Sequence, residues 1–215
     1  MKKQIITAAI LFTIIPAVAV AGPLVGIGYA DIGLSGHSGR PGVTVTAGNL
    51  YSNNVVASGS ASFARGFYSM NVSVGKLIPA GGVSFVPYLG TDFLNLNYNQ
   101  QETGYTSSTV NAGYGYTYTY QTPYSYTQGA SIQDLYFLVG ANMDIPLSHR
   151  VALQIGGGYG HTAMVMDGNG GATYKGKVKV GFEIAPRVTA SLGVDYLHVP
   201  GASLTCYGAG LSYHF

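Results

Sequence analysis

Apolar residues occupy every second position in several segments of the chain. In 174–184, Tyr174, Val178 and Phe182 share one side of an extended strand, and Lys175 and Lys179 lie on the other. A period of two is typical of a β-strand with one apolar and one polar face. The same alternation predicts strands at 67–78, 83–99, 132–145, 151–163, 188–196 and 203–215.

The segment Ala185-Pro186-Arg187 predicts a short turn between the strands 174–184 and 188–196. A register that pairs Ile184 with Val188 would place Lys177 directly opposite Asp195. A slip by one residue would move the lysines to the apolar face. We therefore expect the register of this hairpin to be firmly set.

The N-terminal third allows two strand counts. Residues 24–35 could form the first strand with 36–66 as a long loop, which gives eight strands in total. Alternatively, 42–51 and 55–64 pair as a further hairpin, which gives ten. Glycines in this region weaken either assignment. We favour eight strands, with ten as the alternative.

The composition is unusual for a domain in water. Only 8% of the residues are charged, against about 25% in ordinary soluble domains, and the mean hydropathy is positive. No run of 18 apolar residues long enough for a spanning helix follows the N-terminal segment. A chain of this kind is expected to cross a membrane as a closed antiparallel up-and-down β-barrel. The near-neutral charge gives no indication of nucleic-acid binding.

The first 21 residues have the pattern of a secretory signal peptide. Lys2 and Lys3 precede an apolar stretch, and the small residues Ala19-Val20-Ala21 follow it. This layout predicts cleavage after Ala21 and export of the chain from Gly22. We expect residues 22–215 to form one barrel domain.

The C-terminal strand carries the sharpest motif. In "YGAGLSYHF", Tyr213 stands two places before the terminal Phe215. This ending resembles the assembly signal of bacterial outer-membrane β-barrel proteins, here of small OmpX/OmpA-like architecture. The resemblance implies a place in the outer membrane, contact with its lipid and lipopolysaccharide, and recognition by the barrel-assembly machinery. A weaker resemblance, to the YfaZ-like outer-membrane family, rests on "DIGLSGHSGRPG", "AGNLYSNN" and the short Pro/Gly turns.

The polar faces of the strands predict a charged lumen. An eight-stranded barrel has an interior that its own side chains fill, and buried charges persist there only when paired. We therefore expect a lumenal ion network rather than a pore lining, with a narrow channel for small solutes as the alternative. Its predicted members are Asp92, Asp134, Lys175, Lys177, Lys179, Glu183 and Asp195.

Connection lengths orient the predicted barrel and single out one loop. The turns at 79–82, 146–150 and 185–187 are short, as on the periplasmic side, whereas the connections 100–131 and 164–173 are longer and belong on the outside.

The loop 100–131 is rich in tyrosine, and we expect it to form a hairpin in which 110–120 pairs with 124–135 across 121–123. Its tyrosines suit either a membrane-interface belt or a binding surface for host or neighbouring-cell proteins or glycans. They are Tyr114, Tyr116, Tyr118, Tyr120, Tyr124 and Tyr126.

Catalysis has weaker support. Some outer-membrane barrels that this chain resembles modify lipid A with a histidine beside a serine or aspartate at the outer rim. The matching pairs here are His37–Ser38, His161–Asp167 and His198–Ser203. No Gly-x-Ser-x-Gly stretch or metal-ligand cluster accompanies them, and Cys206 is the single cysteine. We expect no enzyme, cofactor or metal, and a structural or adhesive role.

Overall fold

The computed structural model describes residues 22–35, 38–111, 117–167 and 169–215, so the predicted signal peptide lies outside the described residues. They form two units, one of residues up to Leu96 and Ile132–Phe215, the other Asn97–Ser131. The strands are β1 (Gly22–Leu34), β2 (Arg40–Leu50), β3 (Val55–Ala64), β4 (Phe67–Lys76), β5 (Ile78–Ala80), β6 (Val83–Asn111), β7 (Thr117–Pro146), β8 (Val151–Asp167), β9 (Ala172–Ala185), β10 (Val188–Val199) and β11 (Ala202–His214).

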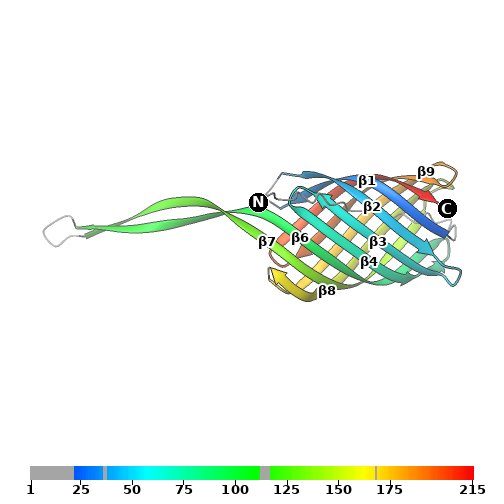
Figure 1. Cartoon of the computed structure of the whole chain (residues 1–215), viewed down its shortest axis with the longest axis horizontal. Coiled ribbons are helices and arrows are strands. Elements are labelled where there is room, and N and C mark those ends of the chain that lie inside the picture. Colours follow the sequence, from blue (N-terminus) through cyan, green and yellow to red (C-terminus); the bar gives the residue numbers. More distant parts are fainter. Residues whose placement is uncertain (1–21, 36–37, 112–116, 168) are drawn as a thin grey trace, which may run out of the picture. The chain divides into compact units, whose positions relative to one another are not determined.

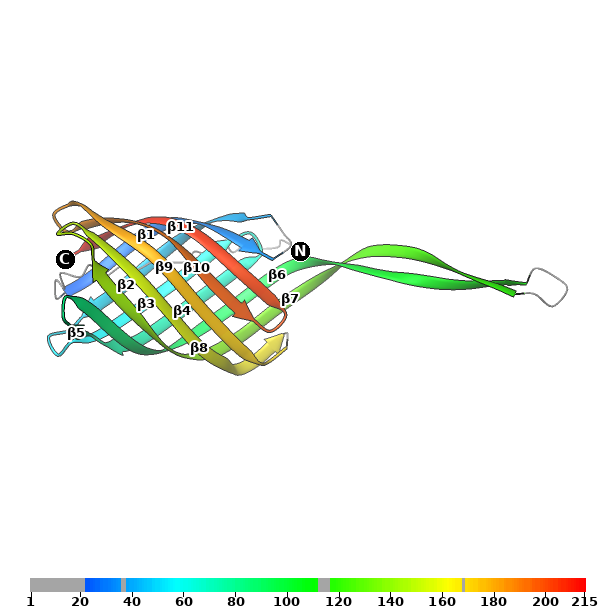
Figure 2. The same cartoon turned by 180° about the vertical axis from the view of Figure 1, so that it is seen from behind.

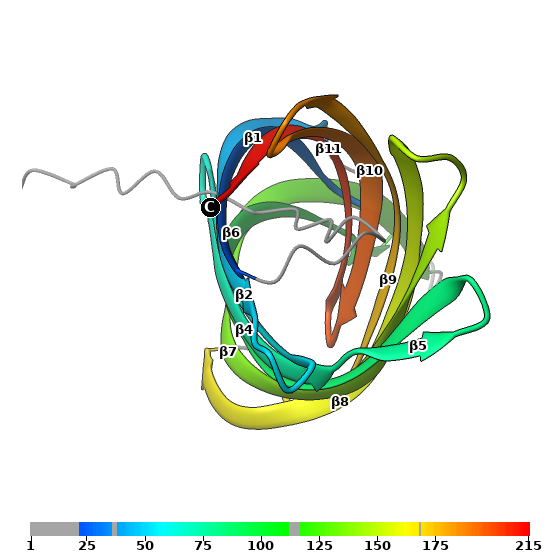
Figure 3. The same ribbon diagram turned by 90° about the vertical axis from the view of Figure 1, so that its right-hand side faces the viewer.

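Ten of the described strands close into an antiparallel barrel. β1 pairs with β2 on one side and with β11 on the other, and β4 pairs with β6. The short strand β5 pairs only with the start of β6 and is not part of the ring. Figure 1 shows the tilted strands β1 to β4, Figure 2 shows β8 to β11 side by side from behind, and Figure 3 shows the ring. The fold is therefore the closed antiparallel barrel that the alternation predicts.

The ring has ten strands rather than the favoured eight, so the alternative with a second N-terminal hairpin is confirmed. β2 and β3 pair along their length, from Gly42 opposite Ala64 to Leu50 opposite Val56. The expected long loop 36–66 was wrong because its glycines do not break these strands. A Cβ at Gly42 would lie 2.5 Å from the carbonyl oxygen of Phe63, so glycine fits a close approach of backbones there.

The hairpin of β9 and β10 has the predicted pairing at its centre and a different one at its end. Lys177 lies directly opposite Asp195, as expected. At the turn, however, Val188 faces Ala185 and not Ile184, because the register shifts between Val188 and Thr189. This irregularity adds one residue to β9 beside the turn.

The outer surface of the barrel is apolar, and its inner surface is mostly polar at mid-height. On β9, Val178 is 50% exposed, whereas Lys179 beside it is 4% exposed. Exposed apolar side chains continue around the ring, for example Ile27 on β1, Val72 on β4 and Leu192 on β10. Such an apolar belt suits contact with lipid. Among the described residues, no helix is long and apolar enough to cross a membrane.

Buried apolar side chains occupy both ends of the interior. One cluster joins Leu50, Val56, Leu77 and Val86 at the end of the barrel where Gly22 and Phe215 lie. The opposite half holds a second buried set, and the polar side chains lie between the two. This second set includes Ile32, Leu34, Phe67, Leu94, Leu96, Leu138, Val199 and Leu204.

The connections differ in length between the two ends of the barrel. At the end that holds Gly22 and Phe215, residues 51–54, 77–82, 147–150 and 186–187 join the strands, in agreement with the short turns predicted there. The connections at the other end are also short, except for the one that contains the second unit. The expectation of several extended outer loops therefore reduces to a single long hairpin.

The apolar belt yields a stability test. Val178 lies at the middle of β9, so replacing it with arginine should lower the free energy of unfolding by about 2–4 kcal/mol. Urea unfolding of the barrel in lipid vesicles measures this, with Ser52→Arg in the exposed β2–β3 turn as the control. Equal stability of the two variants would contradict a lipid-facing Val178.

Candidate functional site

The lumen contains an ion pair between opposite sides of the barrel. The Lys175 Nζ atom on β9 lies 2.5 Å from Asp92 Oδ2 on β6. The amide of Asn71 on β4 donates a hydrogen bond to the other oxygen of Asp92. Because Asp92 is almost fully buried, these two donors supply the compensation that its charge needs. Two of the predicted network residues thus meet, with Asn71 as a partner that the sequence did not indicate.

A second ion pair joins Asp195 to a lysine other than its cross-strand neighbour. Although Lys177 is the cross-strand neighbour of Asp195, the contact within 4 Å is with Lys179, whose Nζ atom lies 3.3 Å from Asp195 Oδ2. The pair is therefore diagonal, two residues along β9, which a long lysine side chain can span. Lys177 therefore faces Asp195 as predicted, but the ion pair of Asp195 is made by Lys179.

The other predicted network residues lie apart from these pairs. Asp134 is buried and accepts hydrogen bonds from the Tyr136 hydroxyl at 3.2 Å and the Met166 amide at 3.2 Å, not from a lysine. Glu183 is exposed at the end of β9 beyond the buried section. In contrast, Asp144 was not predicted as a member but is buried, and it accepts a hydrogen bond from Gln154 at 2.7 Å. Its even spacing from Asp134 on β7 is the signal that could have found it.

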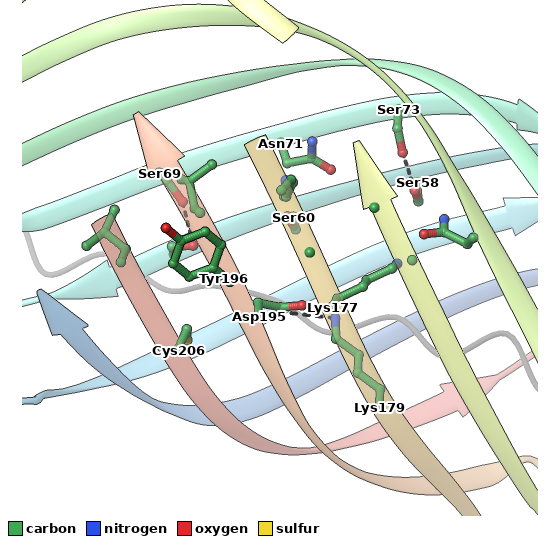
Figure 4. Close-up of a pocket in the computed structure, with 18 of the residues that line it drawn as sticks. Ser58, Ser60, Ser69, Asn71, Ser73, Lys177, Lys179, Asp195, Tyr196 and Cys206 are labelled. Carbon is green, nitrogen blue, oxygen red and sulfur yellow. Dashed lines mark hydrogen bonds and ion pairs between the residues drawn. The ribbon is translucent and has the colours of Figure 1, made fainter. Parts of the chain in front are cut away.

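A cavity of about 130 Å³ lies beside the ion pairs. Figure 4 shows its two walls: Lys177, Lys179 and Asp195 come from β9 and β10, and the facing side chains come from β3 and β4. The facing wall carries Ser58, Ser60, Ser62, Ser69, Asn71 and Ser73. Hydroxyl–hydroxyl hydrogen bonds join Ser58 to Ser73 at 2.8 Å and Ser69 to Ser62 at 2.6 Å.

Glycines on β7 and β8 make room for the large polar side chains of the lumen. A Cβ at Gly140 or Gly158 would lie within 3 Å of the Tyr88 hydroxyl oxygen. A Cβ at Gly156 would collide with the amide oxygen of Asn142 and lie 2.7 Å from Lys177 Cε. The glycine run of β8 therefore matches the bulk of side chains that cross the lumen.

The tyrosine-rich segment is a two-stranded ribbon in the second unit, residues 97–131. The Thr109 and Thr119 hydroxyl oxygens lie 3.1 Å apart, and Gly104 lies beneath the ring of Tyr124. Both contacts fit one register between β6 and β7. β6 ends at Asn111 and β7 begins at Thr117, so the predicted turn at 121–123 was wrong because those residues continue β7.

One face of this ribbon is aromatic. Tyr120, Tyr124 and Tyr126 alternate along β7 and so share a face, and about half of each side chain is exposed. The rings of Tyr124 and Tyr126 stack with centroids 6.0 Å apart. Tyr118 belongs to β7 by sequence position, whereas Tyr114 and Tyr116 lie outside the described residues.

The opposite face of the ribbon is mostly polar. Gln121, Ser125 and Thr127 occupy the odd positions of β7 and are exposed. Pro123 and, by the same register, Tyr105 of β6 share that face, and Tyr105 is the exception to its polarity. The two faces therefore differ in chemistry, and this difference provides a matched control for mutagenesis.

The histidine–serine and histidine–aspartate pairs have different outcomes. His198 Nδ1 lies 2.8 Å from Ser203 Oγ, and the Tyr196 hydroxyl donates to the same oxygen at 3.3 Å. His161 instead contacts the carbonyl of Thr162, and His37 lies outside the described residues. The structure thus joins one pair, but no carboxylate of the described chain hydrogen-bonds His198 to orient it as a catalytic base.

The C-terminal motif forms the end of the closing strand. The rings of Tyr213 and Phe215 meet edge to face with centroids 5.0 Å apart, and both side chains are exposed. The amide of Phe215 donates to the carbonyl of Pro23 at 3.0 Å. Recognition of these residues by the assembly machinery stays a prediction.

Comparison with known proteins finds similar solved structures but no similar family or curated protein. No family model matches the chain, and no curated protein matches it. A solved NanC porin is similar in structure, with 12% identity, a TM-score of 0.50, and coverage of 89% of this chain and 100% of that one. A KdgM porin gives 12% identity, a TM-score of 0.43, and coverage of 88% and 99%. Ail of Yersinia pestis gives 11% identity, a TM-score of 0.35, and coverage of 91% of this chain and 97% of that one.

The chain has the fold of bacterial outer-membrane β-barrels. The closed ring and its apolar belt agree with the location predicted from the sequence, the bacterial outer membrane, and with surrounding lipid and lipopolysaccharide. At such low identity the similarity extends to the fold and not to a role. The resemblance to the YfaZ-like family stays a prediction.

The Lys175–Asp92 pair yields a test of the lumenal network. Lys175→Met leaves a buried carboxylate without its cation, so we expect a loss of about 3–5 kcal/mol in the free energy of unfolding. Adding Asp92→Asn should recover most of that loss, because it removes the uncompensated charge. Urea unfolding in lipid vesicles measures both. An unchanged midpoint for Lys175→Met would show that this pair does not support the barrel.

Proposed function

We propose that the protein is an adhesive outer-membrane barrel whose contacts are made by the ribbon of residues 97–131. The observation that carries the proposal is the exposed aromatic face of Tyr120, Tyr124 and Tyr126. Tyrosine offers a large rigid ring with a polar tip, a combination that is common at protein and glycan contacts.

The surroundings of these rings support a contact role. Gly104 lies under Tyr124, and Tyr124 stacks on Tyr126, so the rings are held against the ribbon without being buried. Rings that are ordered before binding lose little conformational entropy when a partner covers them. Each strand of a two-stranded ribbon also has one free edge, which is a surface that another strand can extend.

The connectivity supports an outer location for the ribbon. It joins β6 to β7, and strand alternation assigns that connection to the side opposite Gly22 and Phe215. Long connections of outer-membrane barrels lie on the outside of the cell. The partner is then a protein or glycan of a host or neighbouring cell surface.

The tyrosine face can be tested by substitution. The triple variant Tyr120→Ser, Tyr124→Ser, Tyr126→Ser should reduce adherence of cells that display the protein by about tenfold or more, because aromatic anchors dominate contact energy. The control is Gln121→Ala, Ser125→Ala, Thr127→Ala on the opposite face, which should adhere normally. Heat-dependent gel mobility measures assembly of both variants.

Two results would contradict the adhesive role. Normal adherence of the tyrosine variant would exclude the aromatic face as the contact. Failed membrane insertion of that variant, with normal insertion of the control, would instead assign the tyrosines to the membrane-interface belt.

A narrow channel for small solutes is the second candidate. Ten strands and a polar cavity of about 130 Å³ favour it. The buried apolar sets at the two ends of the lumen favour a filled interior. We place the channel second because a conducting path needs water along the whole axis.

Conductance separates these two candidates. The adhesive barrel with a filled lumen predicts no discrete openings when the purified protein is inserted in a planar bilayer. Reproducible single-channel steps would favour the channel. The control is the double variant Leu94→Ala with Leu96→Ala, which removes large side chains from the second buried apolar set. It shows whether the assay detects conductance once that set no longer fills the lumen.

We also propose that the protein is not an enzyme. The contact of His198 with Ser203 provides a hydroxyl near an imidazole, but the described residues give the imidazole no third, orienting group. An interface hydrogen bond accounts for this contact without catalysis.

A further inference from the structure

We propose that the lumen binds a small oxyanion at Lys177. The described residues place this lysine in the wall of a polar cavity and give its ammonium group no ion pair. The inference goes beyond the adhesive role, because it concerns the barrel interior and not the ribbon.

Of the three lysines beside the cavity, Lys177 is the one for which the described residues show no ion pair within 4 Å. Lys175 pairs with Asp92 at 2.5 Å, and Lys179 pairs with Asp195 at 3.3 Å. Asp195 is the cross-strand neighbour of Lys177 but is engaged by Lys179. The remaining nearby carboxylate, Asp144, lies two residues along the strands, in the row of Gln154 and Lys179, and accepts its hydrogen bond from Gln154 at 2.7 Å. A cation in such a partly buried place favours an anionic partner.

The strand register explains why Lys177 lies next to the amide of Asn142. Lys177 faces Gly156 on β8, and Gly156 faces Asn142 on β7. Because Gly156 has no side chain, Asn142 and Lys177 approach each other above it. The amide oxygen of Asn142 is buried and has no hydrogen-bond partner in the described part of the chain. The row therefore combines an ammonium group that has no ion pair in the described chain with an unsatisfied amide oxygen. Rotating that amide by 180° would offer its N–H₂ group to an anion.

The opposite wall supplies hydrogen-bond donors. Ser58, Ser60 and Ser73 line the same cavity, and a hydroxyl can rotate to donate to an anion. The volume of about 130 Å³ equals roughly four times the share of one water in the liquid. That space fits a phosphate-, sulfate- or carboxylate-sized group and not an oligomer. Charge-assisted hydrogen bonds from an ammonium and hydroxyls are the chemistry that recognises such oxyanions.

Binding of inorganic phosphate to the refolded full-length mature chain tests the site. Calorimetry in detergent micelles, at constant ionic strength set with sodium chloride, should give one phosphate per chain. Lys177→Met should lower the affinity about tenfold or more, because it removes the charge. Lys177→Arg should retain binding, because it keeps the charge and the donors. Lys76→Met, at the exposed end of β4, is the matched control and should bind as the parent does.

Stability provides a second readout that does not depend on access to the folded lumen. Refolding in phosphate should raise the ratio of folded to unfolded protein in proportion to phosphate concentration above Kd. Lys177→Met should abolish that gain while folding normally in chloride, because it removes a cation that lacks an ion pair. Sulfate and acetate at the same ionic strength identify the preferred oxyanion class.

Three outcomes would overturn the proposal. These are no phosphate binding by the parent chain, equal binding by Lys177→Met and the parent, and equal stabilisation by chloride and every oxyanion, which would indicate ionic strength alone. Binding without conductance would leave both the oxyanion site and the filled lumen intact.

Discussion

Closure of the backbone hydrogen-bond ladder is the constraint on which the whole structure depends. A strand in lipid has no water to satisfy its amide and carbonyl groups, so every strand needs two neighbours. The pairing of β1 with β11 and of β4 with β6 meets that requirement around the ring. Closure also separates two environments, because alternate side chains face lipid and lumen. The apolar belt and the polar cavity are therefore two consequences of one geometry.

The lumen shows how this barrel accommodates charge away from bulk water. Lys175 reaches across to β6, and Lys179 reaches diagonally to β10, so two carboxylates receive direct cationic partners. Glycines on β7 and β8 provide the space that these long side chains need. Apolar layers at both ends limit the polar section to the middle of the barrel. Adhesion and oxyanion binding would then use separate parts of the chain, the ribbon and the lumen.

Much of the fold could be predicted from the sequence because a strand's period is local. The alternation at 174–184 identified β9, its inward lysines and the Asp195–Lys177 register. Local pattern could not give the ion-pair partners, because Lys175 and Asp92 lie far apart in sequence and meet only after closure. The strand count was misjudged because glycine within a single segment indicates an interrupted strand. In β2, however, Gly42 permits the close approach of the neighbouring backbone of β3. The ribbon turn was misplaced because Pro123 suggested a reversal, although proline is tolerated at the edge of a two-stranded ribbon.

The division between a supporting barrel and a contacting ribbon is the central claim of this account. Replacing residues 97–131 with a short Gly-Asn turn, followed by parallel assays of membrane insertion and cell adherence, tests it most directly. The account predicts that the shortened chain inserts and resists urea like the parent, since the closing pairs β1–β11 and β4–β6 lie outside the deleted segment, but no longer adheres. Unchanged adherence of a correctly inserted shortened barrel would contradict it.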